Sequence, residues 1–435
     1  MKSSGNMATG FIFFVLCVTI LTINAFSDET RYKDKSSSFT PVEENGQWSY
    51  VGDVDGVYIR LQFNILDSFS EGLARIALDD FCMGEYGFID KSGQLAILPQ
   101  YLHALPFSGG FAAVIILDGE DELYGFIDES GELVIDAEYR QAGSFSQGLA
   151  AVETFAEGNT GWGFIDRNGE MIIDPQFNYA NPFSEGLAMV GIDYKNGYID
   201  EHGNIIIDPQ YDRAFEFSEG LAAVGINDDG YKFGFIDKEG DTAVPLQYEW
   251  ANSFSEGLAA VRVGEKWGFI DKAGTFVAEP QFDRVSYFSE GLALFRIGDQ
   301  ETGRWGFVNK DGEIEIEPQF ILAGNFSAGL AMIMIWEDDK GKCGYIDKTG
   351  EIVIEPQFDS AASFTEGLAL VQNGDDHSFI DKSGDIVLNT PTVEKAWEFM
   401  DGIGRILINN NGEWRHGYID TKGRIVFIAH CYEDG

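Results

Sequence analysis

A block of residues recurs along this chain at intervals of 34 to 39 residues. Its first motif, Gly-aromatic-aliphatic-Asp, begins at Gly87, Gly125, Gly163, Gly197, Gly234, Gly268, Gly306, Gly344 and Gly417, with Ser378 in the glycine position between the last two. A second motif, Phe-Ser-Glu-Gly-Leu-Ala, first appears at Phe69 and ends in a degenerate copy at Phe399. A Pro-Gln-aromatic block, as in Pro280-Gln281-Phe282, lies between them. Three motifs in constant order predict a tandem array of about ten units, each of about 37 residues.

Residues 257–294 form the most regular unit. The alternating apolar residues predict strands over 257–263, 267–271 and 275–278, joined by a tight turn at 264–266. Asp271 and Gly274 occupy the first and fourth positions of a type I turn, where glycine accepts a left-handed backbone. Pro280 is expected to end the third strand because proline cannot donate to a ladder. Each unit is therefore a three-stranded meander followed by a connector, and no segment has helical periodicity.

The second strand of this unit has apolar side chains on both faces. Trp267 and Phe269 point to one side and Ile270 to the other. Only neighbouring units can cover both faces, which predicts an all-β array with a shared core. An open, solenoid-like or superhelical stack is the preferred architecture, because propeller blades usually have four strands and number four to eight. The alternative is a closed, propeller-like ring.

The N-terminal residues have a different composition. Residues 11–26 are almost entirely apolar and follow Lys2, and Ala25-Phe26-Ser27 fits a cleavage site. This predicts a signal peptide over 1–27, with an uncleaved membrane anchor as the alternative. Residues 28–47 are expected to be a polar linker, and 48–435 to be the repeat array. Both alternatives predict an exported protein, secreted or held at the cell envelope.

The chain carries 29 basic and 72 acidic residues, a formal net charge of −43. This charge argues against binding nucleic acid or an anionic membrane surface, both of which require basic residues. The four cysteines suggest neither a disulfide framework nor a zinc site. Cys343 replaces the aromatic residue of a motif, so we expect it to be buried as a small hydrophobe.

Copies differ in length mainly between the first and second strands. In a regular stack these loops emerge on the same edge, and binding sites of repeat proteins tend to lie where copies differ. Many of these loop residues are acidic, and they are the candidate binding residues: Asp118, Glu120, Asp121, Glu122, Asp228, Asp229, Asp299, Glu301, Glu337, Asp338, Asp339, Asp375 and Asp376.

The three motifs together resemble the bacterial WG-repeat family. The consensus Trp-Gly-Phe-Ile-Asp-Lys-x-Gly, Val-Ile-x-Pro-Gln-Phe-Asp and Phe-Ser-Glu-Gly-Leu-Ala-x-Val is similar to that family from about Trp48 to the C-terminus. Tyr86, Tyr124, Phe233 and Cys343 depart from it at the tryptophan position. The resemblance implies a β-rich array, commonly in exported or membrane-linked proteins, and carries no catalytic residues with it.

Catalytic and cofactor motifs are absent from the sequence. It contains no Gly-x-Ser-x-Gly, His-Glu-x-x-His or phosphate-binding glycine motif. The five histidines, His103, His202, His377, His416 and His430, are read as incidental and in unrelated repeat positions. We therefore predict no enzyme activity, no catalytic or metal site and no cofactor, with calcium as the one alternative in the acidic loops. The recurring turn aspartates are expected to bind their own backbone.

These observations predict a non-catalytic surface that binds a protein or envelope component. A cell-wall or polysaccharide binder is the first alternative, since flat aromatic side chains beside glycine can stack on sugars. It requires exposed tryptophan or tyrosine in the motif, whereas the core interpretation requires burial. A hydrolase with an unrecognised site is the second alternative. The sequence leaves the partner and the oligomeric state open.

Overall fold

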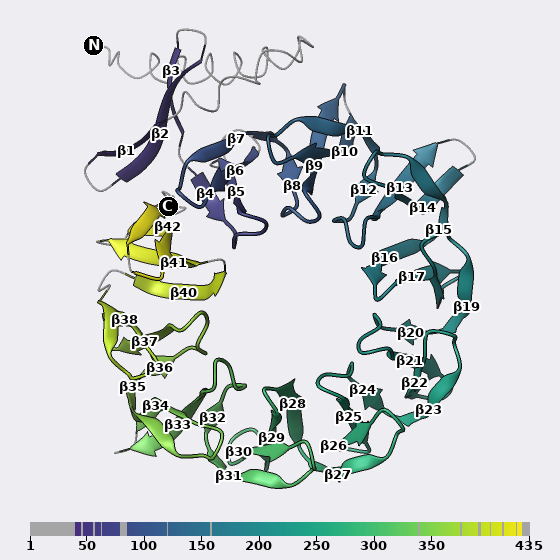
Figure 1. Cartoon of the computed structure of the whole chain (residues 1–435), viewed down its shortest axis with the longest axis vertical. Helices are drawn as coiled ribbons and strands as arrows, with labels where there is room; N and C mark the ends of the chain where they lie inside the picture. Colours follow the sequence, from purple (N-terminus) through teal and green to yellow (C-terminus); the bar gives the residue numbers. More distant parts are fainter. Residues whose placement is uncertain are drawn as a thin grey trace, which may run out of the picture.

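The computed structural model describes residues 40–428 except 45–46, 55–56, 62, 79–84, 120, 157–158, 338–339, 375, 390–392, 401, 411–412 and 423. Ten sheets of four strands follow one another around a closed ring with a wide central opening (Figure 1). A separate sheet of β1 (Thr40–Glu44), β2 (Gln47–Val54) and β3 (Val57–Leu61) precedes them. No helix that is long and apolar enough to cross a membrane occurs among these residues. The fold is a ten-bladed β-propeller.

The four strands of each blade are antiparallel and consecutive in the sequence, and we number the blades 1 to 10 from β4–β7 to β40–β43. The strands nearest the central opening are β4 (Phe63–Leu66), β8 (His103–Ala104), β12 (Gln141–Ala142), β16 (Tyr179–Ser184), β20 (Arg213–Ala214), β24 (Trp250–Ala251), β28 (Arg284–Ser289), β32 (Leu322–Ala323), β36 (Ser360–Ala361) and β40 (Val393–Met400). The second strands are β5 (Leu73–Leu78), β9 (Phe111–Asp118), β13 (Ala150–Ala156), β17 (Leu187–Ile192), β21 (Ala222–Asn227), β25 (Leu258–Val263), β29 (Leu292–Ile297), β33 (Ala331–Glu337), β37 (Ala369–Asn373) and β41 (Ile403–Asn410). The third strands are β6 (Tyr86–Asp90), β10 (Asp121–Asp128), β14 (Asn159–Ile165), β18 (Lys195–Ile199), β22 (Tyr231–Ile236), β26 (Lys266–Asp271), β30 (Arg304–Asn309), β34 (Lys340–Ile346), β38 (Asp376–Ile380) and β42 (Glu413–Asp420). The outermost strands are β7 (Leu95–Tyr101), β11 (Leu133–Tyr139), β15 (Met171–Phe177), β19 (Ile205–Tyr211), β23 (Thr242–Tyr248), β27 (Phe276–Phe282), β31 (Ile314–Phe320), β35 (Ile352–Phe358), β39 (Ile386–Asn389) and β43 (Ile425–Ile428).

The all-β tandem array predicted from the sequence is confirmed, and it is the closed ring rather than the preferred open stack. The preference rested on three strands per unit, but the connector supplies a fourth. Trp250 and Ala251, for example, pair with Arg262 and Val261. Two paired residues have no periodicity of their own, so the sequence pattern did not reveal this strand.

The outermost strands continue past their proline, contrary to the expected stop. In blade 6, Trp267 pairs with Phe282 and Phe269 with Ala278, so β27 bulges around Pro280. An edge strand tolerates proline because its missing N–H faces away from the ladder. A Cβ on Gly268 would lie 2.6 Å from the Ala278 carbonyl oxygen, which explains the glycine of the motif. Ser378 replaces that glycine in blade 9, where no such bulge interrupts the pairing of Ser378 with Asn389 and Phe379 with Leu388.

The core lies between blades, as the two apolar faces of the second motif strand predicted. Phe269 of blade 6 contacts Phe288 of blade 7, with ring centroids 5.0 Å apart. The same aromatic pair occurs at every interface of the ring: Phe88–Phe107, Phe126–Phe145, Phe164–Phe183, Tyr198–Phe217, Phe235–Phe254, Phe269–Phe288, Phe307–Phe326, Tyr345–Phe364, Phe379–Phe399 and Tyr418–Phe69. These side chains are buried. Each blade therefore depends on its neighbours for its hydrophobic contacts.

Hydrogen bonds also join adjacent blades in one constant direction. The Ser255 hydroxyl donates to the carbonyl oxygen of Phe288 in the next blade at 2.9 Å. Equivalent serines do the same along the ring: Ser70, Ser108, Ser146, Ser184, Ser218, Ser289 and Ser327. The serine of the second motif therefore fixes the distance between neighbouring blades.

The first and last blades meet through the same kind of contacts. β4 lies against β42, and Phe69 contacts Tyr418 at 4.9 Å between ring centroids. Every blade is built from its own four consecutive strands, so closure involves no exchange of a strand between the chain ends. Side-chain packing and hydrogen bonds between blades hold the ring shut.

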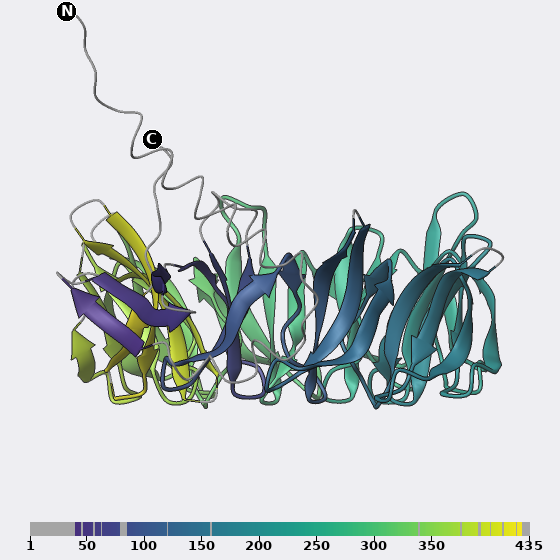
Figure 2. The ribbon, with the colours of Figure 1, turned by 90° about the horizontal axis from the view of Figure 1, so that it is seen from above.

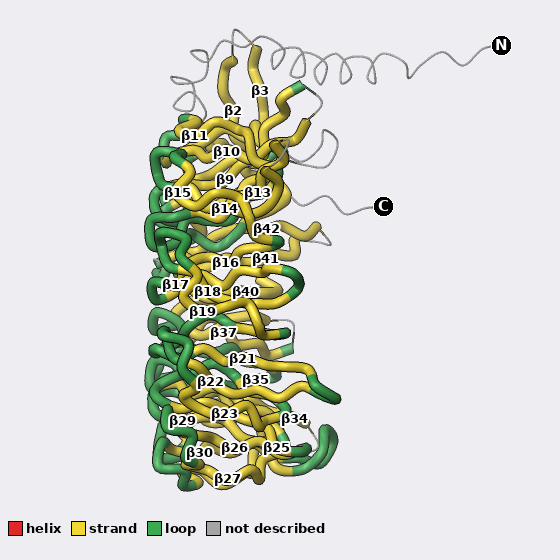
Figure 3. The backbone as a smooth tube through the Cα atoms, turned by 90° about the vertical axis from the view of Figure 1, so that its right-hand side faces the viewer, coloured by secondary structure: helices red, strands yellow, loops and turns green. Residues whose placement is uncertain are grey.

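The two faces of the ring differ, as Figures 2 and 3 show. On one face, the turn face, lie the short turns after the first and third strands of each blade. On the other, the loop face, lie the hairpin loops between the second and third strands, which vary in length. Length variation between copies is therefore confined largely to one face.

Several sequence predictions concern residues at the N-terminus. The predicted signal peptide, residues 1–27, lies outside the described residues, and so does most of the expected linker. Residues 40–44 and Gln47 of that linker belong to β1 and β2. β2 lies against β43 of the last blade.

Candidate functional site

The side chain of the recurring turn aspartate accepts hydrogen bonds from the backbone of its own turn. Asp271 Oδ1 accepts hydrogen bonds from the Ala273 N–H at 3.0 Å and the Thr275 N–H at 2.8 Å. Asn309 makes the equivalent pair of bonds in blade 7. This is the side-chain-to-backbone turn predicted from the Asp-x-x-Gly spacing. No group of three or more metal-ligating side chains occurs in the parts of the chain that the structure describes.

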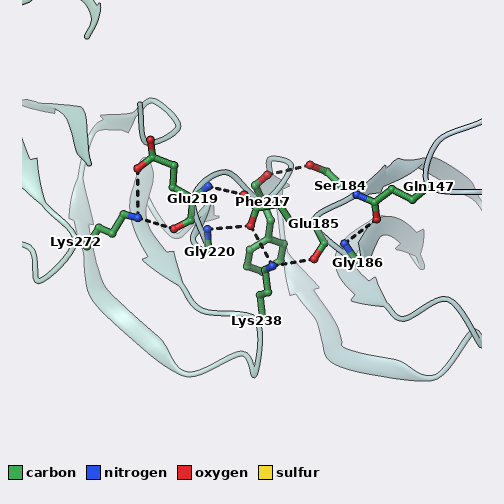
Figure 4. Close-up of polar contacts among 9 residues, drawn as sticks. All are labelled: Gln147, Ser184, Glu185, Gly186, Phe217, Glu219, Gly220, Lys238 and Lys272. Carbon is green, nitrogen blue, oxygen red and sulfur yellow. Dashed lines mark hydrogen bonds and ion pairs between the residues drawn. The ribbon is translucent and has the colours of Figure 1, made fainter. Parts of the chain in front are cut away.

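The glutamate of the second motif binds backbone N–H groups and a lysine of the next blade on the turn face, and we call this set of contacts the clasp (Figure 4). Glu185 accepts hydrogen bonds from the N–H groups of Glu219 and Gly220 at 2.7 and 2.9 Å. The Lys238 ammonium lies 3.1 Å from the same carboxylate and donates to the Glu185 carbonyl oxygen at 2.8 Å. Glu219, Glu256 and Glu290 form the same ion pair with Lys272, Lys310 and Lys348.

These contacts lower the pKa of Glu185, whose backbone is also in an unusual conformation. Partial burial alone would raise its pKa, but the hydrogen bonds from Lys238, Gly220 and Glu219 outweigh burial and hold that pKa below its usual value. Glu185 has a φ of 51°, a left-handed conformation that is unfavourable for a residue with a Cβ. Ala328 has the same conformation at the equivalent position, with a φ of 56°, so the turn and not the carboxylate sets it. The ion pair and the backbone hydrogen bonds of Glu185 join blades 4 and 5.

A second set of acidic residues ties blades together on the loop face. Asp283, directly after β27, accepts a hydrogen bond from Lys266 Nζ at 2.7 Å and one from the Gly298 N–H at 2.8 Å. The equivalent residues Asp212, Glu249 and Asp359 bind Lys195, Lys232 and Lys342. Sequence reasoning missed these residues, although an acidic residue recurs after the Pro-Gln-aromatic block, 17 positions from its lysine. The partners could be assigned only once the blades were placed side by side.

The acidic residues predicted to form a binding site lie in hairpin loops of blades 2, 5, 7, 8 and 9. Asp121, Glu122, Asp228, Asp229, Asp299, Glu301 and Asp376 are exposed on the loop face. Glu120, Asp338, Asp339 and Asp375 lie outside the described residues, and only the backbone of Asp118 and Glu337 is described. The loops share a face but come from separate blades, so they form a scattered rim and not a single cluster.

One of these residues caps its own loop. Asp299 Oδ1 accepts bonds from the Thr302 N–H at 2.7 Å, the Thr302 hydroxyl at 2.8 Å and the Glu301 N–H at 3.0 Å. The bonds from Thr302 and Glu301 lower the pKa of Asp299. The remaining described carboxylates of these loops are exposed and give the loop face negative charge.

The family model of the WG containing repeat matches eight segments of this sequence: residues 86–118, 124–154, 162–195, 197–228, 233–267, 267–300, 305–335 and 344–375. Together these segments cover more than half of the chain. The chain belongs to the WG containing repeat family. Each WG repeat begins at the third strand of one blade and runs to the second strand of the next. A repeat in the sequence therefore bridges two blades in the structure.

Three solved structures have low similarity to this WG repeat protein. The tricorn protease has 12% identity and a TM-score of 0.24, covering 84% of this chain and 44% of that chain. Puromycin hydrolase has 9% identity and a TM-score of 0.32, covering 86% and 55%. KlHsv2 with loop 6CD replaced by a Gly-Ser linker has 10% identity and a TM-score of 0.31, covering 66% and 97%. The chain thus spans about half the length of the first two. No curated protein matches it.

The tryptophan position of the WG repeat is neither fully exposed nor uniformly buried. Trp162, Trp267 and Trp305 are half-buried, whereas Phe233 and Cys343 are each 1% exposed. Cys343 is thus the small buried hydrophobe that its place in the motif indicated. Because the indoles are half-buried, the structure is compatible with the alternative that they stack on sugars. Phe233 and Cys343, which replace tryptophan, belong to the core.

Two histidines share a repeat position, contrary to the expectation that all five are unrelated. His377 and His416 both stand directly before the glycine position of the first motif, where other copies have tryptophan. His416 Nδ1 is buried and has no hydrogen-bond partner among the described atoms. Burial, reinforced by the charge of Arg405, lowers the pKa of His416 to about 4. At neutral pH this histidine is therefore uncharged.

Proposed function

We propose that this WG repeat protein is a non-catalytic binding scaffold whose loop face holds a partner protein at the cell envelope. The observation that carries the proposal is the difference between the faces. The turn face repeats one glutamate–lysine ion pair at the four consecutive interfaces from blade 4 to blade 8, whereas the loop face varies in loop length and charge from blade to blade. Variable loops on a rigid repeat frame are typical of recognition surfaces.

The charge of the loop face favours a basic partner. Asp228 and Asp229 are exposed at one hairpin tip, and Asp299 and Glu301 are exposed at another. Electrostatic complementarity of this kind mainly speeds association and selects partners by charge. The apolar segment 11–26 supports export, and with it a partner outside the cytoplasm.

The proposal is tested with four charge-neutralising substitutions on the loop face: Asp228→Asn, Asp229→Asn, Asp299→Asn and Glu301→Gln. A matched control neutralises four exposed acidic residues of the turn face: Glu129→Gln, Glu201→Gln, Glu239→Gln and Asp311→Asn. Both variants lose the same formal charge. Immobilised proteins are incubated with solubilised envelope fractions, and bound proteins are identified and then retested in purified form.

We expect partners that bind the control variant at least tenfold better than the loop-face variant. An equal loss in both variants relative to wild type would show that net charge alone drives capture, and unchanged retention would show that the loop carboxylates take no part. Either result would contradict a specific loop-face site. Partners lost only by the control would assign recognition to the turn face instead.

A further inference from the structure

At some interfaces the innermost strand of a blade presents a side chain to the tryptophan position of the preceding blade, as His103 does to Tyr86. At the interface of blades 5 and 6 this side chain is Trp250, whose indole contacts Phe233 at 5.1 Å and Phe215 at 6.1 Å between ring centroids. An aromatic ring of the chain itself therefore fills the space between these blades. The equivalent place in other blades is taken by different residues, so each interface has its own lining.

At the interface of blades 6 and 7 the equivalent residue is Arg284, and a cleft of about 680 Å³ opens. Its lining includes Trp267, Trp305, Arg262, Arg284, Glu265 and Asp283. The hairpin beside it, at Gly264 and Glu265, is short. The cleft thus opens on the loop face where a long hairpin is missing.

The cleft contains positive charge that the chain leaves unmatched. Asp283 already accepts hydrogen bonds from Lys266 and the Gly298 N–H. Arg262 has a buried Nε without a hydrogen-bond partner, and its guanidinium forms no ion pair with any described residue. Its guanidinium carbon lies 5.9 Å from the centroid of the Trp267 ring. Arg284 is exposed and likewise has no ion pair within the described ranges.

Unmatched guanidinium groups are notable in a chain with 72 acidic and 29 basic residues. A buried polar group without a partner is unfavourable, and a planar guanidinium binds carboxylate oxygens through two parallel hydrogen bonds. In the same lining, the Trp267 and Trp305 indoles provide flat apolar surfaces. The chemistry that satisfies both features is a ring that has an apolar face and carries a carboxylate.

We propose that this cleft binds a short saccharide of uronic acid residues. Arg262 and Arg284 hold the carboxylates, and Trp267 and Trp305 stack on the sugar rings. The mixture of guanidinium and carboxylate groups with indoles favours a polyhydroxylated ring over a purely apolar one, because its hydroxyls need hydrogen-bond partners. The net charge of −43 repels long polyanions, so the ligand is an oligosaccharide of a few residues.

The proposal is independent of the acidic loops, so either can fail without the other. Tri-galacturonate and the uncharged galactotriose are titrated into the full-length protein by calorimetry, with tryptophan fluorescence as a second readout. The key variant is Arg284→Gln, which changes an exposed residue at the cleft. The matched control is Arg213→Gln at the equivalent position of blade 5, where the guanidinium lies over Tyr231 at 5.8 Å.

We expect saturable binding of tri-galacturonate to one site and at least tenfold weaker binding of galactotriose. Arg284→Gln should weaken tri-galacturonate at least tenfold, Arg284→Lys less, and Arg213→Gln less than twofold. Unchanged thermal unfolding of the variants excludes misfolding. Equal affinity for both sugars, equal effects of Arg284→Gln and Arg213→Gln, or no binding of tri-galacturonate at millimolar concentration would overturn the proposal.

Discussion

The hydroxyl of Tyr418 donates a hydrogen bond to the carbonyl oxygen of Asp67, 351 residues earlier in the chain. Tyr198 and Tyr345 make the same bond to the backbone of their next blades, at 2.6 and 2.7 Å. The interface that closes the ring therefore repeats the contacts of interior interfaces. Closure adds no special element, and a substitution there should have the same cost as one elsewhere in the ring.

Phe69→Ala tests this equivalence against Phe254→Ala. Both side chains are 2% exposed and contact an aromatic ring of the preceding blade, Tyr418 and Phe235 respectively. Truncation of a buried phenylalanine costs about 3–5 kcal/mol, and we expect both variants to fall in that range. Urea unfolding followed by circular dichroism gives the comparison. The exposed neighbour Ser68→Ala serves as the control, and a Phe69→Ala variant as stable as that control would mean that the ring is open.

Glu256→Gln tests the clasp on the turn face. The substitution removes the ion pair with Lys310 and keeps an oxygen for the Gly291 N–H, as Gln147 does for Gly186. The ion pair is partly exposed, so the loss at pH 7 should be below about 1 kcal/mol. Chemical unfolding of the variant and of Glu265→Gln, on an exposed hairpin, gives this comparison.

The same clasp predicts a pH dependence. Partial burial raises the pKa of Glu256, but the bonds from Lys310, Gly291 and Glu290 outweigh it, so the folded pKa lies below the unfolded one. Such a group stabilises the fold above its unfolded pKa, and this stabilisation is lost as pH falls through the folded pKa. Wild type should therefore lose more stability than Glu256→Gln on acidification below pH 4.5. Parallel stability profiles of the two proteins would rule out this contribution.

Substitutions of Asp271 test whether its side chain binds the backbone of its turn or a calcium ion. Asp271→Asn should leave stability almost unchanged, since Asn309 forms the same two bonds in blade 7. Asp271→Ala leaves the Ala273 and Thr275 N–H groups without this acceptor and should cost about 1 kcal/mol. Differential scanning calorimetry in millimolar calcium and in chelator gives the second readout, and we expect the same transition temperature in both. A calcium-dependent rise that Asp271→Asn abolishes would assign the turn to a metal.

His416 in the last blade also makes stability depend on pH, but through a histidine that is uncharged in the folded protein. Burial and Arg405 lower its folded pKa to about 4, against 6.5 for a free histidine. Between these values the unfolded chain binds a proton that the folded protein does not, so stability falls as pH decreases through this window. His416→Tyr, which matches Tyr124 at the same position of blade 2, should flatten this part of the profile. Exposed His202→Gln serves as the comparison variant, and the same slope in all three proteins would contradict the prediction.

The repeat, the strand positions of each unit and the core between units followed from the sequence, because they depend on local alternation and on motif spacing. Predicted strands at 257–263 and 267–271 correspond to β25 and β26 within one residue. The third strand was too short by four residues because the bulge at Pro280 keeps it paired up to Phe282. Ring closure was not resolved, since it depends on a two-residue strand and on the angle between blades.

The polar contacts between blades were harder to predict than the turns within them. Asp271 binds residues two and four positions ahead, so its role can be inferred from spacing alone. Glu185 binds groups 34 and 53 residues away, and that pairing requires the blade arrangement. The cleft beside Arg284 lies at an interface where this arginine takes the place that Trp250 has one blade earlier. This difference between Arg284 and Trp250 is recognised only when the two interfaces are compared in the structure.

Every serine that reaches the next blade does so in the same sense around the ring. Because the ring of head-to-tail blade interfaces is closed, neither terminal blade has a free face to which a further blade could be added. A gene duplication that adds a blade must therefore change the angle between neighbouring blades at every interface of the ring. The number of blades should change rarely within a lineage, while hairpins on the loop face lengthen and shorten freely.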